Sequence, residues 1–177
     1  MKFLVSVLSV CLLLTIAACD RKQPAPVDSR QTTVEAAVTW YDALLADGYR
    51  NLNMNALIQV ATAKIARRAY YQMAAVGESG LKMDSTLQQI TFSPLKEINQ
   101  NTVTISATEK WQYVYWEIKT GKHLFDNSVQ YNLTYTLIRT DGKWLVSDVT
   151  IRSTREEKDS SFIFKRPTNQ PQGGAKK

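Results

Sequence analysis

The spacing of hydrophobic residues divides the chain into a helical part and a later part with a different period. The first apolar stripe at helical spacing comprises Val34, Ala37, Val38, Tyr41, Leu44 and Leu45. It predicts a helix that begins at Thr32 or Thr33 and ends at Gly48. A second stripe, with a spacing of four, comprises Leu57, Ala61, Ile65, Ala69 and Met73. It predicts a helical stretch over 55–76, either continuous or divided near Thr62.

From residue 86 onward apolar and polar residues alternate, which is typical of strands with one buried face. Four strands are predicted, over 87–98, 103–115, 129–138 and 143–153. Pro94 indicates a bulge or an edge position, because proline cannot donate a ladder hydrogen bond. Asp141-Gly142 predicts the last hairpin turn. Helices followed by such a meander predict an α+β fold, with N-terminal helices packed on a curved four-stranded antiparallel sheet.

The N-terminal segment has the pattern of a bacterial secretion signal. Lys2 precedes an uncharged run over 3–18, which is shorter than the roughly 20 apolar residues of a membrane-spanning helix. The run leads into a motif that resembles the bacterial lipobox: Ile16, Ala17, Ala18 and Cys19. The resemblance implies cleavage before Cys19 and acylation of that cysteine, which attaches the protein to a membrane. The alternatives are a short tilted span and an ordinary signal peptide with a chance cysteine.

This cleavage site implies four segments along the chain. They are a lipoprotein signal peptide over 1–18, a flexible tether over 19–31, a folded domain over 32–153 and a basic, largely disordered tail over 154–177. Cys11 leaves with the signal peptide and Cys19 is lipidated, so the mature chain is expected to lack disulfides. Asp20 resembles a retention signal of enteric bacteria, so the outer face of the cytoplasmic membrane is favoured over the outer membrane.

Most of the positive charge lies outside the predicted domain. The formal net charge is +6, yet residues 32–151 contain 11 basic and 11 acidic residues. Residues 152–177 contain 7 basic and 3 acidic residues. Nucleic-acid binding requires basic side chains gathered on the fold itself. We therefore expect no nucleic-acid partner, and a membrane contact made through the acyl chains.

The last predicted hairpin resembles a known family. Its turn, Asp141-Gly142, is followed by Trp144 and a hydrophobic strand, as in the nuclear transport factor 2-like superfamily (a cystatin-like α+β cone). The resemblance covers residues 32–152, and the segment over 109–113 is similar to the intermembrane-space domain branch of plastid-division proteins. Members include isomerases, dehydratases, transport adaptors and non-enzymatic scaffolds, so the resemblance implies a cone of helices and sheet and leaves the activity open.

Few residues suggest catalytic chemistry. The one histidine, His123, is expected at a solvated hairpin tip. Without a mature thiol or a carboxylate cluster, no catalytic residue, metal ligand or cofactor is predicted. The alternative is an enzyme of the isomerase or dehydratase type, with a carboxylate base and a tyrosine hydroxyl. Its candidate residues are Asp42, Glu109 or Asp148 with Tyr41, Tyr113 or Tyr131. A closed cavity with a desolvated carboxylate facing a tyrosine would favour this alternative.

Aromatic residues provide the main indication of binding. Both faces of the strand over 113–116 are apolar, whereas a half-exposed strand has one polar face. This predicts a homo-oligomer, a docked protein or burial beneath the tail segment 162–164. The expected ligand or partner surface is Tyr41, Trp111, Tyr113, Tyr115, Trp116, Tyr131 and Tyr135. We expect a non-enzymatic, lipid-anchored binding or scaffold domain of the bacterial cell envelope, for a protein partner or a small apolar ligand.

Overall fold

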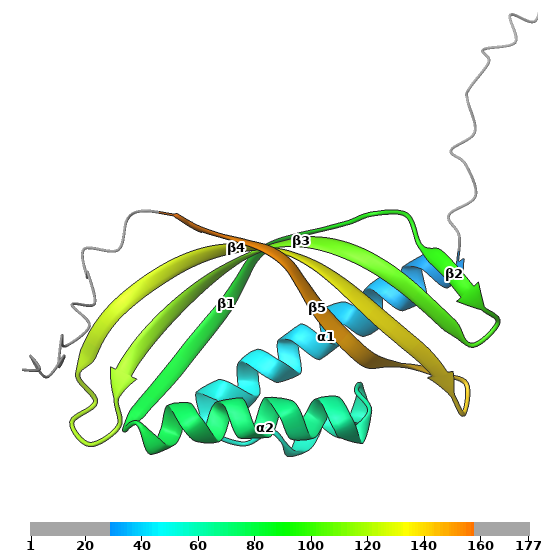
Figure 1. Ribbon diagram of the computed structural model, residues 1–177. Coiled ribbons are helices and arrows are strands. Elements are labelled where there is room, and N and C mark those ends of the chain that lie inside the picture. The colour runs from blue at the N-terminus through cyan, green and yellow to red at the C-terminus, as the bar shows by residue number, and fades with distance from the viewer. Residues whose placement is uncertain (1–28, 158–177) are drawn as a thin grey trace, which may run out of the picture.

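The computed structural model describes residues 29–157 of the chain. Within this range, two α-helices and a short 3₁₀ helix precede five strands (Figure 1). Their bounds are α1 Ser29–Asn51, η1 Asn55–Gln59, α2 Ala63–Glu78, β1 Leu81–Phe92, β2 Lys96–Asn99, β3 Thr102–Glu117, β4 His123–Thr140 and β5 Lys143–Glu157. Helices first and antiparallel strands afterwards confirm the predicted α+β class.

The five strands form one antiparallel sheet in the order β1-β3-β4-β5, with the short β2 beside the first residues of β3. The long strands arch over both helices, which lie on the concave side (Figure 1). Register shifts interrupt the β4–β5 pairing at Asn132/Leu133 and at Thr136/Leu137. Such bulges bend a strand and increase its twist. The curvature turns the sheet and helices into a cone with a hollow interior.

The first predicted strand, 87–98, is in fact two strands, so the sheet has five strands rather than four. β1 ends at Phe92, and β2 begins at Lys96. Pro94 lies between them and has no backbone N–H to donate, which accounts for the interruption. β1 also begins earlier than predicted, at Leu81, and its residues Met83 and Ser85 are buried against the interior.

The second helical stretch is divided into two helices, which is one of the two possibilities predicted from the sequence. η1 ends at Gln59 and α2 begins at Ala63, with Thr62 as the N-cap of α2. The segment between them pairs with β5, because the Thr62 amide donates to the Val146 carbonyl at 2.9 Å and the Val146 amide donates to the Val60 carbonyl at 2.9 Å. This contact fastens the start of α2 to the edge of the sheet.

The prediction that Gly48 ends the first helix is wrong. α1 begins earlier than expected, at Ser29, and continues to Asn51; the residue with a left-handed backbone is Leu52, at φ 52°. Gly48 is buried inside the helix, where an added Cβ would lie 2.3 Å from the Met54 sulfur. The glycine therefore provides space for Met54. By contrast, the hairpin turn is confirmed, since Asp141 and Gly142 have φ of 50° and 79°.

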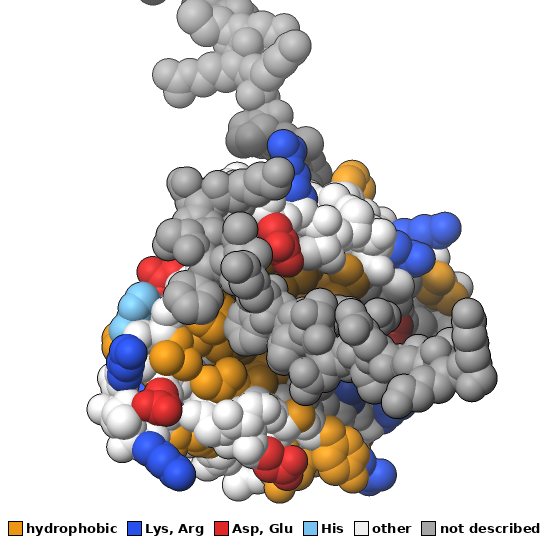
Figure 2. Space-filling model, turned by 60° about the vertical axis from the view of Figure 1, so that its left-hand side comes forward, with side chains coloured by type: hydrophobic (Ala, Val, Ile, Leu, Met, Phe, Trp, Pro, Cys, Tyr) orange, Lys and Arg blue, Asp and Glu red, His pale blue; other side chains and the backbone are white. Residues whose placement is uncertain are grey.

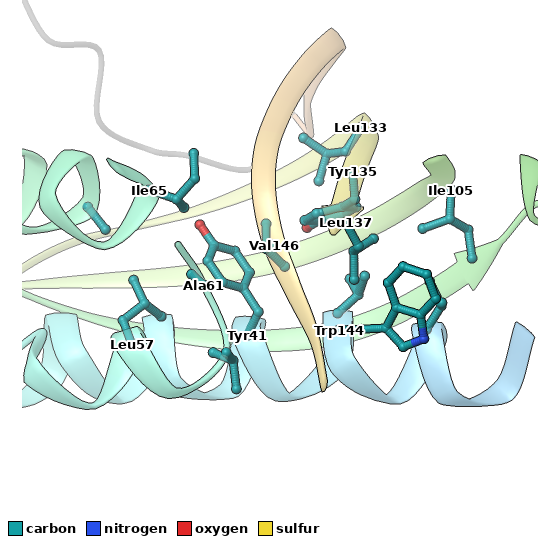
Figure 3. Close-up of a cluster of buried hydrophobic side chains, with 14 of the residues drawn as sticks. Tyr41, Leu57, Ala61, Ile65, Ile105, Leu133, Tyr135, Leu137, Trp144 and Val146 are labelled. Atoms are coloured by element: carbon teal, nitrogen blue, oxygen red, sulfur yellow. The ribbon is translucent and has the colours of Figure 1, made fainter. Parts of the chain in front are cut away.

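One half of the cone is tightly packed. Ile105, Leu137, Trp144 and Val146 lie between the sheet and α1 (Figure 3), and each is at most 7% exposed. The Arg30 guanidinium lies 5.5 Å from the centroid of the Trp144 ring, and the Arg139 guanidinium lies 5.9 Å from the same centroid. Cations over an aromatic face are attracted by its quadrupole. This half forms the compact core of the fold.

The predicted lipidation site lies outside the described residues. Cys19, the lipobox residues 16–18 and the tail segment 162–164 all fall there, so cleavage, acylation and burial beneath the tail stay predictions. Between residues 29 and 157, neither helix is long and apolar enough to cross a membrane.

Candidate functional site

The other half of the cone contains a cavity of about 600 Å³ between the concave sheet face and the two helices. Figure 2 looks at this end of the molecule, where β3 turns into β4, and shows hydrophobic side chains gathered at the centre of the face. Exposed lining residues mark the mouth: Arg68, Gln72, Ala75, Ile151, Thr154 and Glu156. The volume falls within the range of small-molecule sites.

The cavity walls are mainly aromatic and aliphatic. Seven aromatic residues contribute to them: Tyr41, Tyr49, Trp111, Tyr113, Tyr115, Tyr131 and Tyr135. Trp111 and Tyr113 stack with ring centroids 6.2 Å apart and 13° between their planes, although they are only two positions apart on β3. Alternation along the strand directs both side chains to the concave face. These walls suit a flat or ring-shaped apolar molecule.

Two carboxyl groups meet a tyrosine hydroxyl at the cavity floor. Asp42 on α1, Glu109 on β3 and Tyr135 on β4 are each 1% exposed. The Tyr135 hydroxyl lies 2.6 Å from Glu109 Oε1 and 3.2 Å from Asp42 Oδ1. The Trp111 indole N–H donates to Glu109 Oε2 at 2.7 Å. The second oxygen of Asp42, Oδ2, is buried and has no hydrogen-bond partner among the described residues.

Counting hydrogens at the floor requires a protonated carboxyl group. The Tyr135 hydroxyl has one hydrogen and can donate it to only one carboxylate at a time. Two buried carboxylates around one hydroxyl oxygen would also repel each other strongly. Both oxygens of Glu109 accept hydrogen bonds, whereas Asp42 has a single contact. The consistent arrangement has a neutral Asp42 that donates to the Tyr135 oxygen, while Tyr135 donates to an ionised Glu109.

The electrostatics of the three groups agree with this arrangement. Burial, and then the negative charge of Glu109, raises the pKa of Asp42 well above its usual value. Burial also raises the pKa of Glu109, but the hydrogen bonds from Tyr135 and Trp111 oppose that rise. Burial and the neighbouring carboxylates hold the pKa of Tyr135 far above 10.0, so it remains a hydroxyl donor. Asp42 is therefore the group that keeps the proton.

The structure brings together six of the seven aromatic residues predicted as a surface. Tyr41, Trp111, Tyr113, Tyr115, Tyr131 and Tyr135 all line the cavity. Trp116 does not line it, because the alternation of β3 directs its side chain away from that of Tyr115. Its indole donates to Asp84 Oδ2 at 3.0 Å, and its ring lies 5.2 Å from His123. The six inward aromatics form the walls of a cavity with an open mouth rather than a flat, exposed sheet face.

Of the three acids and the histidine considered in the sequence, only two of the acids line the cavity. Asp42 and Glu109 reach the cavity, whereas Asp148 does not line it and accepts a hydrogen bond from Thr150 at 3.0 Å. His123 is exposed, as expected, but it is the first residue of β4, with its Nε2 2.5 Å from Asp126 Oδ1. In the part of the chain described, no three His, Cys, Asp or Glu side chains lie together as a metal site.

Two contributors to the site were missed. Tyr135 was predicted as a surface aromatic, not as the hydroxyl that joins the two acids. Arg68 was not among the predicted site residues, yet it lines the cavity mouth. For Arg68 the signal was in the sequence, since it lies three positions after the inward Ile65.

Neither a protein-family model nor a curated protein sequence matches the chain. Among solved structures, the intermembrane space region of the chloroplast protein ARC6 superposes with a TM-score of 0.61 at 13% identity, covering 68% of this chain and 95% of that one. A ketosteroid isomerase-like protein from Erwinia carotovora atroseptica gives 0.47 at 12% identity, covering 71% and 98%. A hexachlorocyclohexane dehydrochlorinase, LinA type 2, gives 0.48 at 11% identity, covering 77% and 96%.

These similarities show the fold alone, and that fold is the nuclear transport factor 2-like cone that the sequence predicted. The expectation of a non-enzymatic domain is wrong. The solved structures that superpose on the domain include a dehydrochlorinase and an isomerase-like protein. The desolvated carboxyl groups beside Tyr135 also match the arrangement that would favour an enzyme.

Proposed function

We propose that the domain binds a small, largely apolar molecule in its aromatic cavity and exchanges a proton with it, as an isomerase or dehydratase does. The observation that carries this proposal is the contact at the floor, where the carboxyl groups of Asp42 and Glu109 both lie within hydrogen-bond distance of the Tyr135 hydroxyl. Perturbed acids in a cavity that can hold a ligand are a recognised sign of acid–base chemistry.

Asp42 is the group suited to exchange the proton. Its Oδ2 has no partner among residues 29–157, whereas both oxygens of Glu109 accept hydrogen bonds. Once it has lost its own proton, Asp42 can take a proton from one atom of the ligand and return it to another, so that no net proton is consumed. Glu109 acts indirectly, because its negative charge raises the pKa of Asp42. A raised carboxyl pKa brings proton exchange closer to neutral pH.

The Tyr41 hydroxyl supplies a further polar group. Figure 3 shows Tyr41 rising from α1 towards the space between α2 and the sheet, and the residue lines the cavity beside Asp42. Burial, and then the neighbouring carboxyl group of Asp42, raises the pKa of Tyr41, so the hydroxyl keeps its hydrogen. It could donate to a carbonyl oxygen of the ligand and stabilise negative charge that develops there.

A simple isomerisation tests the chemistry. A cyclic β,γ-unsaturated ketone becomes the conjugated ketone by losing one proton and gaining another, and the product is followed by its ultraviolet absorbance. We expect the wild-type protein to accelerate this conversion and Asp42→Asn to slow it at least about tenfold, within the range of general acid–base effects. Asp148→Asn, which lies away from the cavity, is the matched control. Equal rates for wild type and Asp42→Asn would refute the proposed acid–base role.

We also propose that the domain is held at the outer face of a bacterial cytoplasmic membrane by acyl chains on Cys19. Support comes from the lipobox-like residues 16–19 and the uncharged run before them. Intact-mass analysis should show a cleaved, acylated N-terminus in the wild type, and membrane fractions should contain it. Cys19→Ser should abolish the added mass and the membrane association. An unmodified wild-type N-terminus would refute the anchor without affecting the proposed cavity chemistry.

A further inference from the structure

The cavity has a charge at its mouth that a purely apolar ligand would not use. Of the described residues that line it, four have ionisable acidic or basic side chains: Asp42, Glu109, Arg68 and Glu156. The two acids of the floor are buried, whereas Arg68 and Glu156 are exposed at the mouth. Within the described part of the chain, Arg68 carries the one positive charge of this lining.

Arg68 belongs to the inward side of α2 rather than to its outer surface. The residues of α2 that line the cavity follow helical spacing: Ile65, Arg68, Ala69, Gln72, Ala75 and Val76. Its neighbour Arg67 is also exposed but does not line the cavity. The backbone therefore directs one of two consecutive arginines over the cavity mouth.

The guanidinium of Arg68 is available to a ligand. Among residues 29–157 it forms no ion pair and no side-chain hydrogen bond, whereas Arg30 and Arg50 each have a carboxylate partner. Its charge also reaches the interior: burial and Asp42 raise the pKa of Tyr41, and Arg68 opposes that rise. A guanidinium binds the planar or branched oxygens of a carboxylate, sulfonate or phosphate with two parallel hydrogen bonds.

We propose that the molecule bound in this cavity is a compact amphipathic anion, whose apolar body lies against the aromatic walls and whose single anionic group binds Arg68 at the mouth. This inference rests on the proposed function, because it specifies the ligand of the same cavity. The ionised Glu109 at the floor repels an anion, so the charged end faces outward and the apolar end faces Asp42.

Two fluorescent probes that share one apolar skeleton test the proposal. Anilinonaphthalene sulfonate has a single sulfonate, and N-phenylnaphthylamine has the same rings without it. Binding is measured by energy transfer from the tryptophans, one of which, Trp111, lines the cavity. The full chain is used in detergent, and detergent without protein gives the baseline for probe that partitions into micelles.

Arg68→Gln should weaken binding of the sulfonate probe about fivefold, the effect of losing one partly exposed ion pair. The same variant should change binding of the neutral probe by less than about twofold. Added salt should reduce the difference between the probes, since it screens exposed charges. Arg67→Gln is the matched control, because it removes the same charge from the same helix without touching the cavity.

Filling the mouth identifies where the probes bind. Ala75→Trp should displace both probes, and Ala43→Trp, at an exposed position of α1 outside the cavity, should displace neither. If neither probe binds the wild type in the cavity, the proposed function and this inference both fail. If both probes bind and Arg68→Gln affects them equally, or Arg67→Gln has the same effect, ligand binding stands and the assignment of Arg68 is overturned.

Discussion

Replacing Asp42 with asparagine tests directly whether the cavity floor holds a proton. Asparagine has nearly the shape of a protonated aspartic acid and can donate to the Tyr135 oxygen, but it cannot ionise. At about pH 7 the folded wild type must keep a proton that the unfolded chain releases, which lowers its stability. We therefore expect the free energy of unfolding of Asp42→Asn to equal or exceed that of the wild type at this pH.

The dependence on pH gives the size of the effect. Burial raises the pKa of Asp42 in the folded state above the usual 3.8. Below about pH 4 both states are protonated and the group has no influence on stability. As the pH rises further, only the unfolded state releases the proton, and the stability falls by up to about 1.4 kcal/mol per pH unit. The fall ends when the pH passes the raised pKa of the folded protein.

Urea unfolding followed by tryptophan fluorescence, repeated between about pH 4 and about pH 8, measures this slope. The wild type should lose stability as the pH rises, and Asp42→Asn should have a much flatter profile. Asp47→Asn, an exposed acid on the same helix, is the control and should retain the wild-type slope. An unchanged slope in Asp42→Asn would show that Asp42 does not hold the proton, and the arrangement derived for the floor would be wrong.

Three further substitutions test the site and the fold. Tyr135→Phe removes the hydroxyl between the two acids and should lower the free energy of unfolding by about 1–3 kcal/mol in the same urea assay at about pH 7. Ile105→Ala opens a cavity in the packed half and should cost about 2–5 kcal/mol in thermal unfolding, while Ile98→Ala, 57% exposed, should cost at most about 0.5 kcal/mol. Gly142→Ala forces a side chain into a left-handed turn at φ 79° and should cost about 1–2 kcal/mol by thermal unfolding; an unchanged melting temperature would contradict the strain.

Alternation predicted most of the sheet because it reports which face of each strand is buried. Val103, Ile105 and Ala107 are all buried, and their outward neighbours are polar. Boundaries were less predictable, because they depend on tertiary contacts. β4 begins at His123 rather than near residue 129, since it continues to pair with the far end of β3. Gly48 was read as a helix end, but packing against Met54 determines its place.

The sequence indicates that each of the two acids points inward, but it does not indicate that they contact the same tyrosine. Glu109 lies an even number of positions after Val103 and Ala107, so its side chain is on the same inward face of the strand. Asp42 lies one helical turn after the inward Val38, so it also occupies an inward position. Their common contact with Tyr135 depends on how far the sheet curves over α1. That curvature comes from bulges in β4 and β5, which the alternating pattern does not specify. The site was therefore predictable residue by residue, and its geometry was not.

The loss of stability caused by burying two acids at the cavity floor argues that these acids have a chemical role. Burying two acids and forming a large cavity both reduce stability, and apolar residues of similar volume in place of the acids would often be neutral or stabilising. Both costs fall in the same half of the cone, whereas Ile105, Leu137 and Val146 form a compact core in the other half. A domain selected only as a rigid scaffold would have no need for a half that contains a cavity and buried acids. The packed half stabilises the fold, while α1 and β3 position Asp42 and Glu109 at the floor of the cavity in the other half.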